Sequence, residues 1–346
     1  MAVRIVQGTE PIPVEHPVFV LFGEPGICKT SLAQSAEDPL TIDADKGSHR
    51  ASNRRAVAVV NSWEEIAEIT TEPGVLGPYK TLVPDTVGRV LDMMIASIIK
   101  DNPKAARDGG LTQNGWGVLK GKFQQWLAVI RGSGLDVLMV SHQKEEKDGD
   151  TRIVRPDITG GSYAEVMKSA DFVGYVYMRG KERIVDFNPS DRWVGKNPAQ
   201  WGPMVIPPVE KARDFMAKLI AEGRQALGNI SEESAGVTRA VEEWKVTVGA
   251  FTTPEQFTNA IGPINALHKM AGAVVKHLLV DAAKSRGFVF DKEKRAFVGK
   301  VEEKKAEPKK AEPKPEPEAA REPEPEPVGA GAGAVNLPTS TDLFGD

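Results

Sequence analysis

Residues 18–37 read VFVLFGEPGICKTSLAQSAE, and this stretch decides the fold. The apolar run at 18–22 predicts a strand that is buried on both faces of a sheet. Helix-forming residues follow Lys29, and a turn with glycine and proline separates the two elements. A strand, a turn and a helix in direct succession indicate the first β-α unit of a mainly parallel sheet.

The turn matches the phosphate-binding pattern G-x-x-x-x-G-K-[ST], with Cys28 in place of the second glycine. Backbone N–H groups of such a loop point at phosphates. Lys29 would neutralise the β- and γ-phosphates, and the Thr30 hydroxyl would coordinate Mg²⁺. The alternative is a plain turn before Lys-Thr, but the strand and helix around it favour a site for ATP and Mg²⁺. The predicted nucleotide-binding residues are Gly23, Glu24, Pro25, Gly26, Ile27, Cys28, Lys29, Thr30 and Ser31.

Short apolar runs alternate with helical stretches up to about residue 207, which predicts an α/β domain. The further strand candidates are 40–43, 57–60, 81–83, 137–140 and 172–178.

Two of these strands end in acids. Asp85 follows the strand at 81–83, as a metal-binding Walker B acid does, and at this sheet edge it would face the phosphate loop. Pro84 is unusual in a central strand, so the alternative is a turn acid that caps the next helix. Asp43 and Asp45 would point the same way if their strand continued. One of them could polarise the attacking water, and the alternative is a pair of surface acids.

A third strand, at 137–140, is followed by Ser141-His142-Gln143. His142 or Gln143 could sense the γ-phosphate and relay its loss to the next segment, 144–161, which is polar and expected to be mobile. The alternative for His142 is an ordinary capping or core histidine.

Composition narrows the class of protein. A single cysteine excludes internal disulfides and a cysteine-based zinc site. No apolar run is long enough for a membrane span, and the N-terminus lacks a signal-peptide pattern, so we expect a cytoplasmic protein that makes no membrane contact. Nine acidic and six basic residues lie in 302–327 and two more acids in 328–346, which leaves the first 301 residues near +1. Any nucleic-acid contact must therefore come from local patches.

The chain changes character after residue 207. Residues 208–300 predict a small, mostly helical module, with a helix start at Thr253-Pro254-Glu255 and a hairpin at 288–298. Residues 301–346 repeat proline and charge, which predicts a disordered tail. The tail ends in Leu343 and Phe344 between acids.

The motifs together resemble the short, phage-encoded RecA-like P-loop ATPases of single-strand annealing and recombination. The resemblance covers about residues 16–186 and is carried by GEPGICKTSLA, LTIDADKGS, YKTLVPDT, and LMVSHQKEE with DITGGSYAEVMKSADFVGYV. It implies a RecA-like core in which Lys29 and Asp85 serve catalysis and Asp45 replaces the family's catalytic glutamate. It also implies that Gln143 couples the γ-phosphate to a DNA loop that closes at 159–161.

The resemblance further implies two loops that face single-stranded DNA and a site shared between subunits of a ring or filament. The alternative for both loops is solvated, charged surface. The candidate DNA-binding residues are Lys104, Arg107, Trp116, Lys120 and Lys122 in the first loop, and Lys144 and Arg152 in the second. Arg192 and Lys196 are candidates for a cation that reaches a neighbour's site.

The leading interpretation is an Mg²⁺-dependent, DNA-stimulated ATPase that assembles on single-stranded DNA in phage recombination or replication, in the host cytoplasm. One alternative is an AAA-type or clock-type regulatory ATPase that acts on a protein. Another is a nucleotide-binding module with little turnover, because Cys28, Asp45 and Pro84 depart from the pattern. Leu343 and Phe344 are predicted to anchor the tail to a host sliding clamp or single-strand-binding protein.

Overall fold

A computed structural model describes residues 4–72, 74–148, 151–208 and 210–299. These residues form two compact units, one spanning Pro11–Glu232 and the other combining residues 4–10 with 233–299. The predicted tail, including Leu343 and Phe344, lies outside the described residues. None of the helices in the described part has the length and apolar character needed to cross a membrane.

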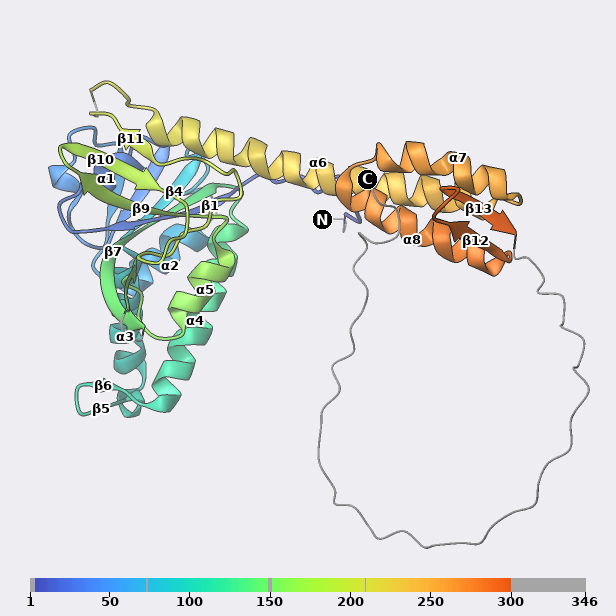
Figure 1. The fold of residues 1–346 in the computed structure, drawn as a ribbon. Coiled ribbons are helices and arrows are strands. Elements are labelled where there is room, and N and C mark those ends of the chain that lie inside the picture. Colours follow the sequence, from blue (N-terminus) through green and yellow to red (C-terminus); the bar gives the residue numbers. More distant parts are fainter. Residues whose placement is uncertain (1–3, 73, 149–150, 209, 300–346) are drawn as a thin grey trace, which may run out of the picture. The chain divides into compact units, whose positions relative to one another are not determined.

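The larger unit is built on one sheet (Figure 1), which confirms the predicted α/β fold. Its strands lie in the order β11-β10-β9-β1-β7-β4-β2-β3, parallel from β9 to β3 and antiparallel at β10 and β11. All six predicted strands are present. The strands are β1 (Val18–Gly23), β2 (Pro39–Asp43), β3 (Ala56–Val59), β4 (Thr81–Asp85), β7 (Asp136–Asp148), β9 (Phe172–Arg179), β10 (Glu182–Asp186) and β11 (Met204–Ile206).

Alternation along β1 explains why both faces of the sheet carry helices. Val18, Val20 and Phe22 enter one apolar cluster, and Phe19 and Leu21 enter another. The first cluster is covered by α2 (Trp63–Thr71), α3 (Val87–Asp101), α4 (Gln113–Arg131) and α5 (Ser162–Ser169), and the second by α1 (Lys29–Ala33) and the start of α6 (Phe215–Gly249). Strands buried on both faces need no polar residue until they reach their ends. The polar side chains therefore gather where the strands end.

The segment expected to be a mobile loop after Gln143 is instead a hairpin. Strand β7 continues to Asp148 and pairs antiparallel with β8 (Thr151–Pro156). Arg152 Nη1 lies 3.3 Å from Glu145 Oε2, its diagonal neighbour across the two strands. A second, very short hairpin joins α3 to α4, formed by β5 (Ala106–Arg107) and β6 (Gly110–Leu111).

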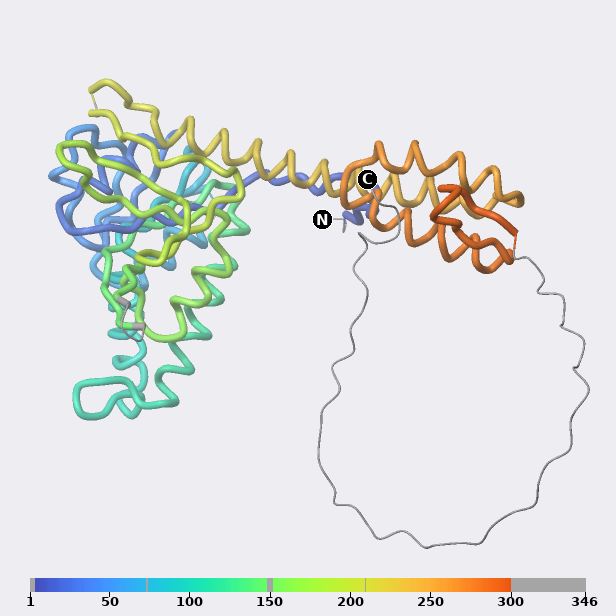
Figure 2. Tube along the Cα trace, in the orientation of Figure 1, coloured from blue at the N-terminus to red at the C-terminus, as the bar shows by residue number. Residues whose placement is uncertain are grey.

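The N-terminal segment runs beside α6, although the two are far apart in the sequence (Figure 2). The Ile12 N–H donates to Ser231 Oγ at 2.7 Å, and Arg224 Nε donates to the Glu15 carbonyl at 2.7 Å. Met216, Leu219 and Ile220 pack into the core of the larger unit. The two units therefore divide within α6, later than the expected boundary at residue 207.

The smaller unit is mostly helical, as predicted. It contains the later turns of α6, α7 (Pro254–Asn265), α8 (Lys269–Ser285) and a hairpin of β12 (Phe288–Asp291) and β13 (Ala296–Gly299). A capping box of Thr253 and Gln256 starts α7 at the predicted position. The core gathers around Phe257, which is fully buried.

Candidate functional site

The phosphate loop leaves β1 at Gly23 and enters α1 at Lys29. Lys29 Nζ donates to the carbonyls of Gly23 at 2.9 Å and Glu24 at 2.7 Å, so the loop wraps around its own lysine. Burial lowers the pKa of Lys29 to about 8, and the charge of Asp85 opposes that shift. A buried cation held by neutral carbonyls favours the approach of an anion.

Cys28 adopts the left-handed conformation, with φ 66° and ψ 29°. Only glycine adopts this region without steric cost, which explains why the phosphate-loop pattern has glycine here. The Cys28 side chain is exposed, so the strain comes from its Cβ and the backbone rather than from crowding by a core. The loop keeps its shape at an energetic cost.

Thr30 and Asp85 link the loop to β4. Thr30 Oγ1 donates to Asp85 Oδ2 at 2.6 Å. Burial raises the pKa of Asp85 to about 6, and the hydrogen bond from Thr30 opposes that shift. Proline has no N–H to donate to a neighbouring strand. Pro84 lies opposite Ile42 of β2, but the residues of β4 that pair with β7 run from Leu82 directly to Asp85. The central strand therefore tolerates Pro84.

This pair of oxygens fits the magnesium site predicted from the sequence. Mg²⁺ takes a carboxylate and a hydroxyl and completes its shell with water and phosphate oxygens. The described residues contain no group of three or more His, Cys, Asp or Glu side chains around one point. A site with one protein carboxylate therefore fits Mg²⁺ held jointly with a phosphate chain.

Asp43 and Asp45 do not share one role, because β2 ends at Asp43. The Asp43 carboxylate is buried and accepts from the N–H groups of Gly47 at 2.9 Å and Ser48 at 3.0 Å. Its two oxygens therefore hold the loop after β2. The chain turns after Asp43. The N–H groups of Ala44 and Asp45 in this turn both donate to the Asp85 carbonyl.

Asp45 enters the cavity beside the phosphate loop. Asp45 Oδ1 lies 3.4 Å from Arg89 Nε, and Asp45 Oδ2 lies 3.5 Å from His142 Nε2. Burial lowers the pKa of His142, the charge of Lys29 adds to that shift, and Asp45 opposes it. The cavity has a volume of about 190 Å³ and its lining includes Lys29, Asp45, Asp85 and His142.

Arg50 and Arg89 are the functional candidates that sequence reasoning missed. Arg50 lines the cavity from a short helix, Ser48–Arg50, and Arg89 reaches Asp45 from the first turn of α3. The only feature of the sequence that points to these two arginines is their position, because each follows a predicted catalytic acid by four or five residues.

Gln143 stands next to this cavity on β7 but is not among its lining residues. Its Oε1 is buried without a hydrogen-bond partner in the described structure, and its backbone pairs with Pro156 of β8. The structure thus places Gln143 between the nucleotide cavity and the β7–β8 hairpin. Its role as a sensor stays a prediction.

The first DNA-binding candidates divide into three kinds of environment. Exposed Trp116 lies against Gly160, and Lys120 lies against Gly161, so α4 meets the predicted 159–161 segment. Lys122 is engaged inside the unit, with Nζ donating to Ser97 Oγ at 2.9 Å. The remaining two, Lys104 and Arg107, are exposed around the β5–β6 hairpin.

The second loop's candidates lie on the β7–β8 hairpin, with Lys144 half-buried and Arg152 exposed beside Glu145. Of the trans-acting candidates, Lys196 donates from Nζ to the Ala170 carbonyl of its own chain. Arg192 has an exposed side chain, and its carbonyl accepts from the Val154 N–H at 2.7 Å. Arg192 is thus the more available of the two cations.

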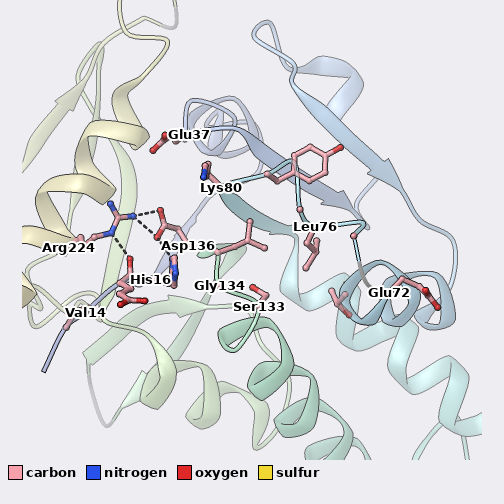
Figure 3. A pocket seen from close by; sticks show the side chains of 16 residues that line it. Val14, His16, Glu37, Glu72, Leu76, Lys80, Ser133, Gly134, Asp136 and Arg224 are labelled. Carbon is pink, nitrogen blue, oxygen red and sulfur yellow. Dashed lines mark hydrogen bonds and ion pairs between the residues drawn. The ribbon is translucent and has the colours of Figure 1, made fainter. Parts of the chain in front are cut away.

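A larger cavity lies elsewhere (Figure 3). It has a volume of about 800 Å³ and lies at the opposite edge of the sheet, where the parallel strands begin. Arg224 Nη2 donates to both oxygens of buried Asp136, at 2.7 and 2.6 Å, and His16 lies 3.6 Å from the same carboxylate. These contacts tie α6 and the N-terminal segment to β7, which is a structural role.

Comparison with known proteins agrees with the geometry around Lys29 and Asp85. Residues 15–199, more than half of the chain, match the model of a family described as an AAA domain. The chain belongs to this family. The AAA domain contains the phosphate loop, the acids of β2 and β4 and the end of β7, so it is a P-loop ATPase-type domain.

One solved structure similar to this chain is a KaiC-like protein from the hyperthermophilic archaeon Pyrococcus horikoshii. It is 12% identical, with a TM-score of 0.32, and the match covers 57% of this chain and 99% of that chain. No curated protein matches the sequence.

Proposed function

We propose that the chain is an Mg²⁺-dependent ATPase that works on single-stranded DNA in phage recombination or replication. The observation that supports hydrolysis best is the 2.6 Å hydrogen bond between Thr30 and Asp85, with Asp45 in the same cavity. It joins a phosphate loop, a metal ligand and a second carboxylate at one sheet edge.

The residues divide the chemistry of in-line attack of water on a γ-phosphate. Lys29 carries the charge that faces the phosphates, while Thr30 and Asp85 would hold Mg²⁺, which when bound neutralises phosphate charge. Asp45 would orient the attacking water and accept its proton. Positioning and charge stabilisation account for most of the catalysis in this class of reaction.

The DNA side of the proposal is supported by two segments that meet. Trp116 and Lys120 on α4 contact Gly160 and Gly161, which brings an exposed aromatic ring and a cation together as single-strand binding requires. The β7–β8 hairpin begins at Gln143, beside the nucleotide cavity. Movement of this strand end with the state of the γ-phosphate would couple hydrolysis to DNA, and assembly into a ring or filament would repeat the unit along a strand.

The test is the rate of phosphate release from ATP, with and without single-stranded DNA. We expect stimulation by DNA, loss of all activity in Lys29→Ala, and loss of stimulation alone in a Trp116→Ala/Lys120→Ala variant. Lys181→Ala, at an exposed lysine in the turn between β9 and β10, is the matched control. Hydrolysis that DNA does not change would contradict the DNA role, and stimulation by a protein partner instead would favour a regulatory ATPase.

One observation favours a nucleotide-binding module with little turnover as the second candidate. Asp45 is engaged by Arg89 and His142 rather than free. Tight binding of ATP with no phosphate release, in the presence or absence of DNA, would support that alternative.

A further inference from the structure

A second cavity, of about 540 Å³, lies beside the nucleotide cavity, at the β3 edge of the sheet. Four basic residues line it, namely Lys46, His49, Arg54 and Arg55. The sequence has no acid between Asp45 and Glu64, and this basic cavity plays no part in the hydrolysis described above.

The basic cavity carries more positive than negative charge. Its one acidic lining residue, Asp43, is a single carboxylate against Lys46, Arg54 and Arg55, and it accepts from the N–H groups of Gly47 and Ser48. Neither guanidinium of Arg54 or Arg55 has an ion-pair or hydrogen-bond partner within the described ranges. Unpaired cations lining a concave surface concentrate field and attract anions.

A buried hydroxyl in the lining points to a ligand rather than to a general surface charge. Ser48 is 1% exposed, lines the basic cavity, and has an Oγ without any hydrogen-bond partner in the part of the chain that is described. Buried polar atoms are nearly always paired in native proteins. A phosphate oxygen would accept from this hydroxyl and from the arginines together.

The apolar part of the lining belongs to the outer strand. In β3, Ala56 and Ala58 pack against the core, and Val57 and Val59 line the cavity instead. Val59 is 63% exposed. The lining of the basic cavity therefore combines cationic and apolar side chains, and its volume is within the size range of small-molecule sites.

We propose that the basic cavity is a second ligand site, for a small molecule that carries a chain of phosphates. Its phosphates would meet Ser48, Arg54 and Arg55, and its less polar part would lie against Val57 and Val59. Single-stranded nucleic acid carries the same phosphate chemistry, but the lining offers no Phe, Tyr or Trp side chain on which a base could stack. The proposal does not depend on hydrolysis at Lys29.

The test is calorimetric titration of the full chain with inorganic tripolyphosphate in a Lys29→Ala background, which disables the phosphate loop. We expect one remaining site. Arg54→Ala/Arg55→Ala should weaken it by about 100-fold and Ser48→Ala by about tenfold, as expected for roughly tenfold per charge-assisted hydrogen bond. Lys181→Ala/Lys211→Ala removes two exposed charges elsewhere and should change nothing, and unfolding temperatures confirm that each variant folds.

Each result decides the matter. No binding in the Lys29→Ala background, or equal weakening in the Lys181/Lys211 control, would overturn the site. An unchanged affinity for tripolyphosphate in Ser48→Ala would mean that the anion binds to surface charge alone, and this result would also overturn the proposed site. A parallel titration with a short oligothymidylate separates the two sources of phosphate: loss of that binding alone in Arg54→Ala/Arg55→Ala would replace the small ligand by a nucleic-acid strand.

Discussion

Replacing Cys28 by glycine should make the AAA domain more stable. The residue is held at φ 66°, ψ 29°, a conformation that costs an L-residue about 1–2 kcal/mol and glycine nothing. Glycine also gains freedom in the unfolded chain, which takes back about 0.4–1 kcal/mol. The exposed thiol contributes little packing, so the mid-values of the two ranges give a net gain in the free energy of unfolding of about 0.8 kcal/mol.

Urea unfolding under reducing conditions measures this difference, and for a domain of this size it corresponds to a rise of roughly 1–4 °C in melting temperature. Cys28→Ala is the matched control, because it removes the sulfur and keeps the Cβ at positive φ. Its stability should stay within about 0.5 kcal/mol of the parent chain. If Cys28→Gly were no more stable than the parent, or if Cys28→Ala gained as much, backbone strain at this position would be refuted.

Four further predictions concern the site and the tail. Asp85→Asn should abolish the loss of stability that the parent apo-protein shows as pH rises from about 4 to about 6. A carboxyl with a raised folded pKa holds its proton more tightly in the native state across that window. Comparing urea unfolding of the two chains should show a difference approaching about 3 kcal/mol. Asp45→Asn should bind ATP with little loss and release phosphate at least about 100-fold more slowly, and equal loss of both properties would argue for a structural role. Gln143→Ala should lose DNA stimulation while basal hydrolysis stays within about twofold of the parent rate, and parallel loss of both would remove the sensor. Deletion of residues 339–346 should leave hydrolysis intact and reduce capture by host sliding clamp or single-strand-binding protein in a pull-down, whereas equal capture of both chains would contradict an anchoring role.

The sequence predicted the central parallel strands well because they are buried on both faces and are largely apolar. Val18–Gly23 is the clearest case. The β7–β8 hairpin was missed for the opposite reason. Its residues are charged, so they read as a loop, although Asp148-Gly149 is a dipeptide typical of hairpin turns.

The positions of the site residues could be predicted where a sequence motif determines the geometry. They could not be predicted where the geometry depends on how the chain turns after a strand. Lys29 and Thr30 follow from the phosphate-loop pattern. The separation of Asp43 from Asp45 depends on where β2 ends, which alternation along a strand cannot reveal. Arg89 reaches Asp45 only through the packing of α3 against the sheet, and no local pattern encodes that contact.

The loop held by Asp43 has a consequence for how the two cavities communicate. Gly47, Arg50 and Ala51 face the nucleotide cavity, while Lys46, Ser48 and His49 face the basic cavity. One short backbone segment thus lies between the two cavities and lines both. A ligand that orders this segment from one cavity changes the free-energy cost of ordering it for a ligand in the other cavity, and thermodynamic linkage makes the effect reciprocal. If bound ATP changes the affinity of the basic cavity for its ligand by some factor, that ligand must change the affinity for ATP by the same factor.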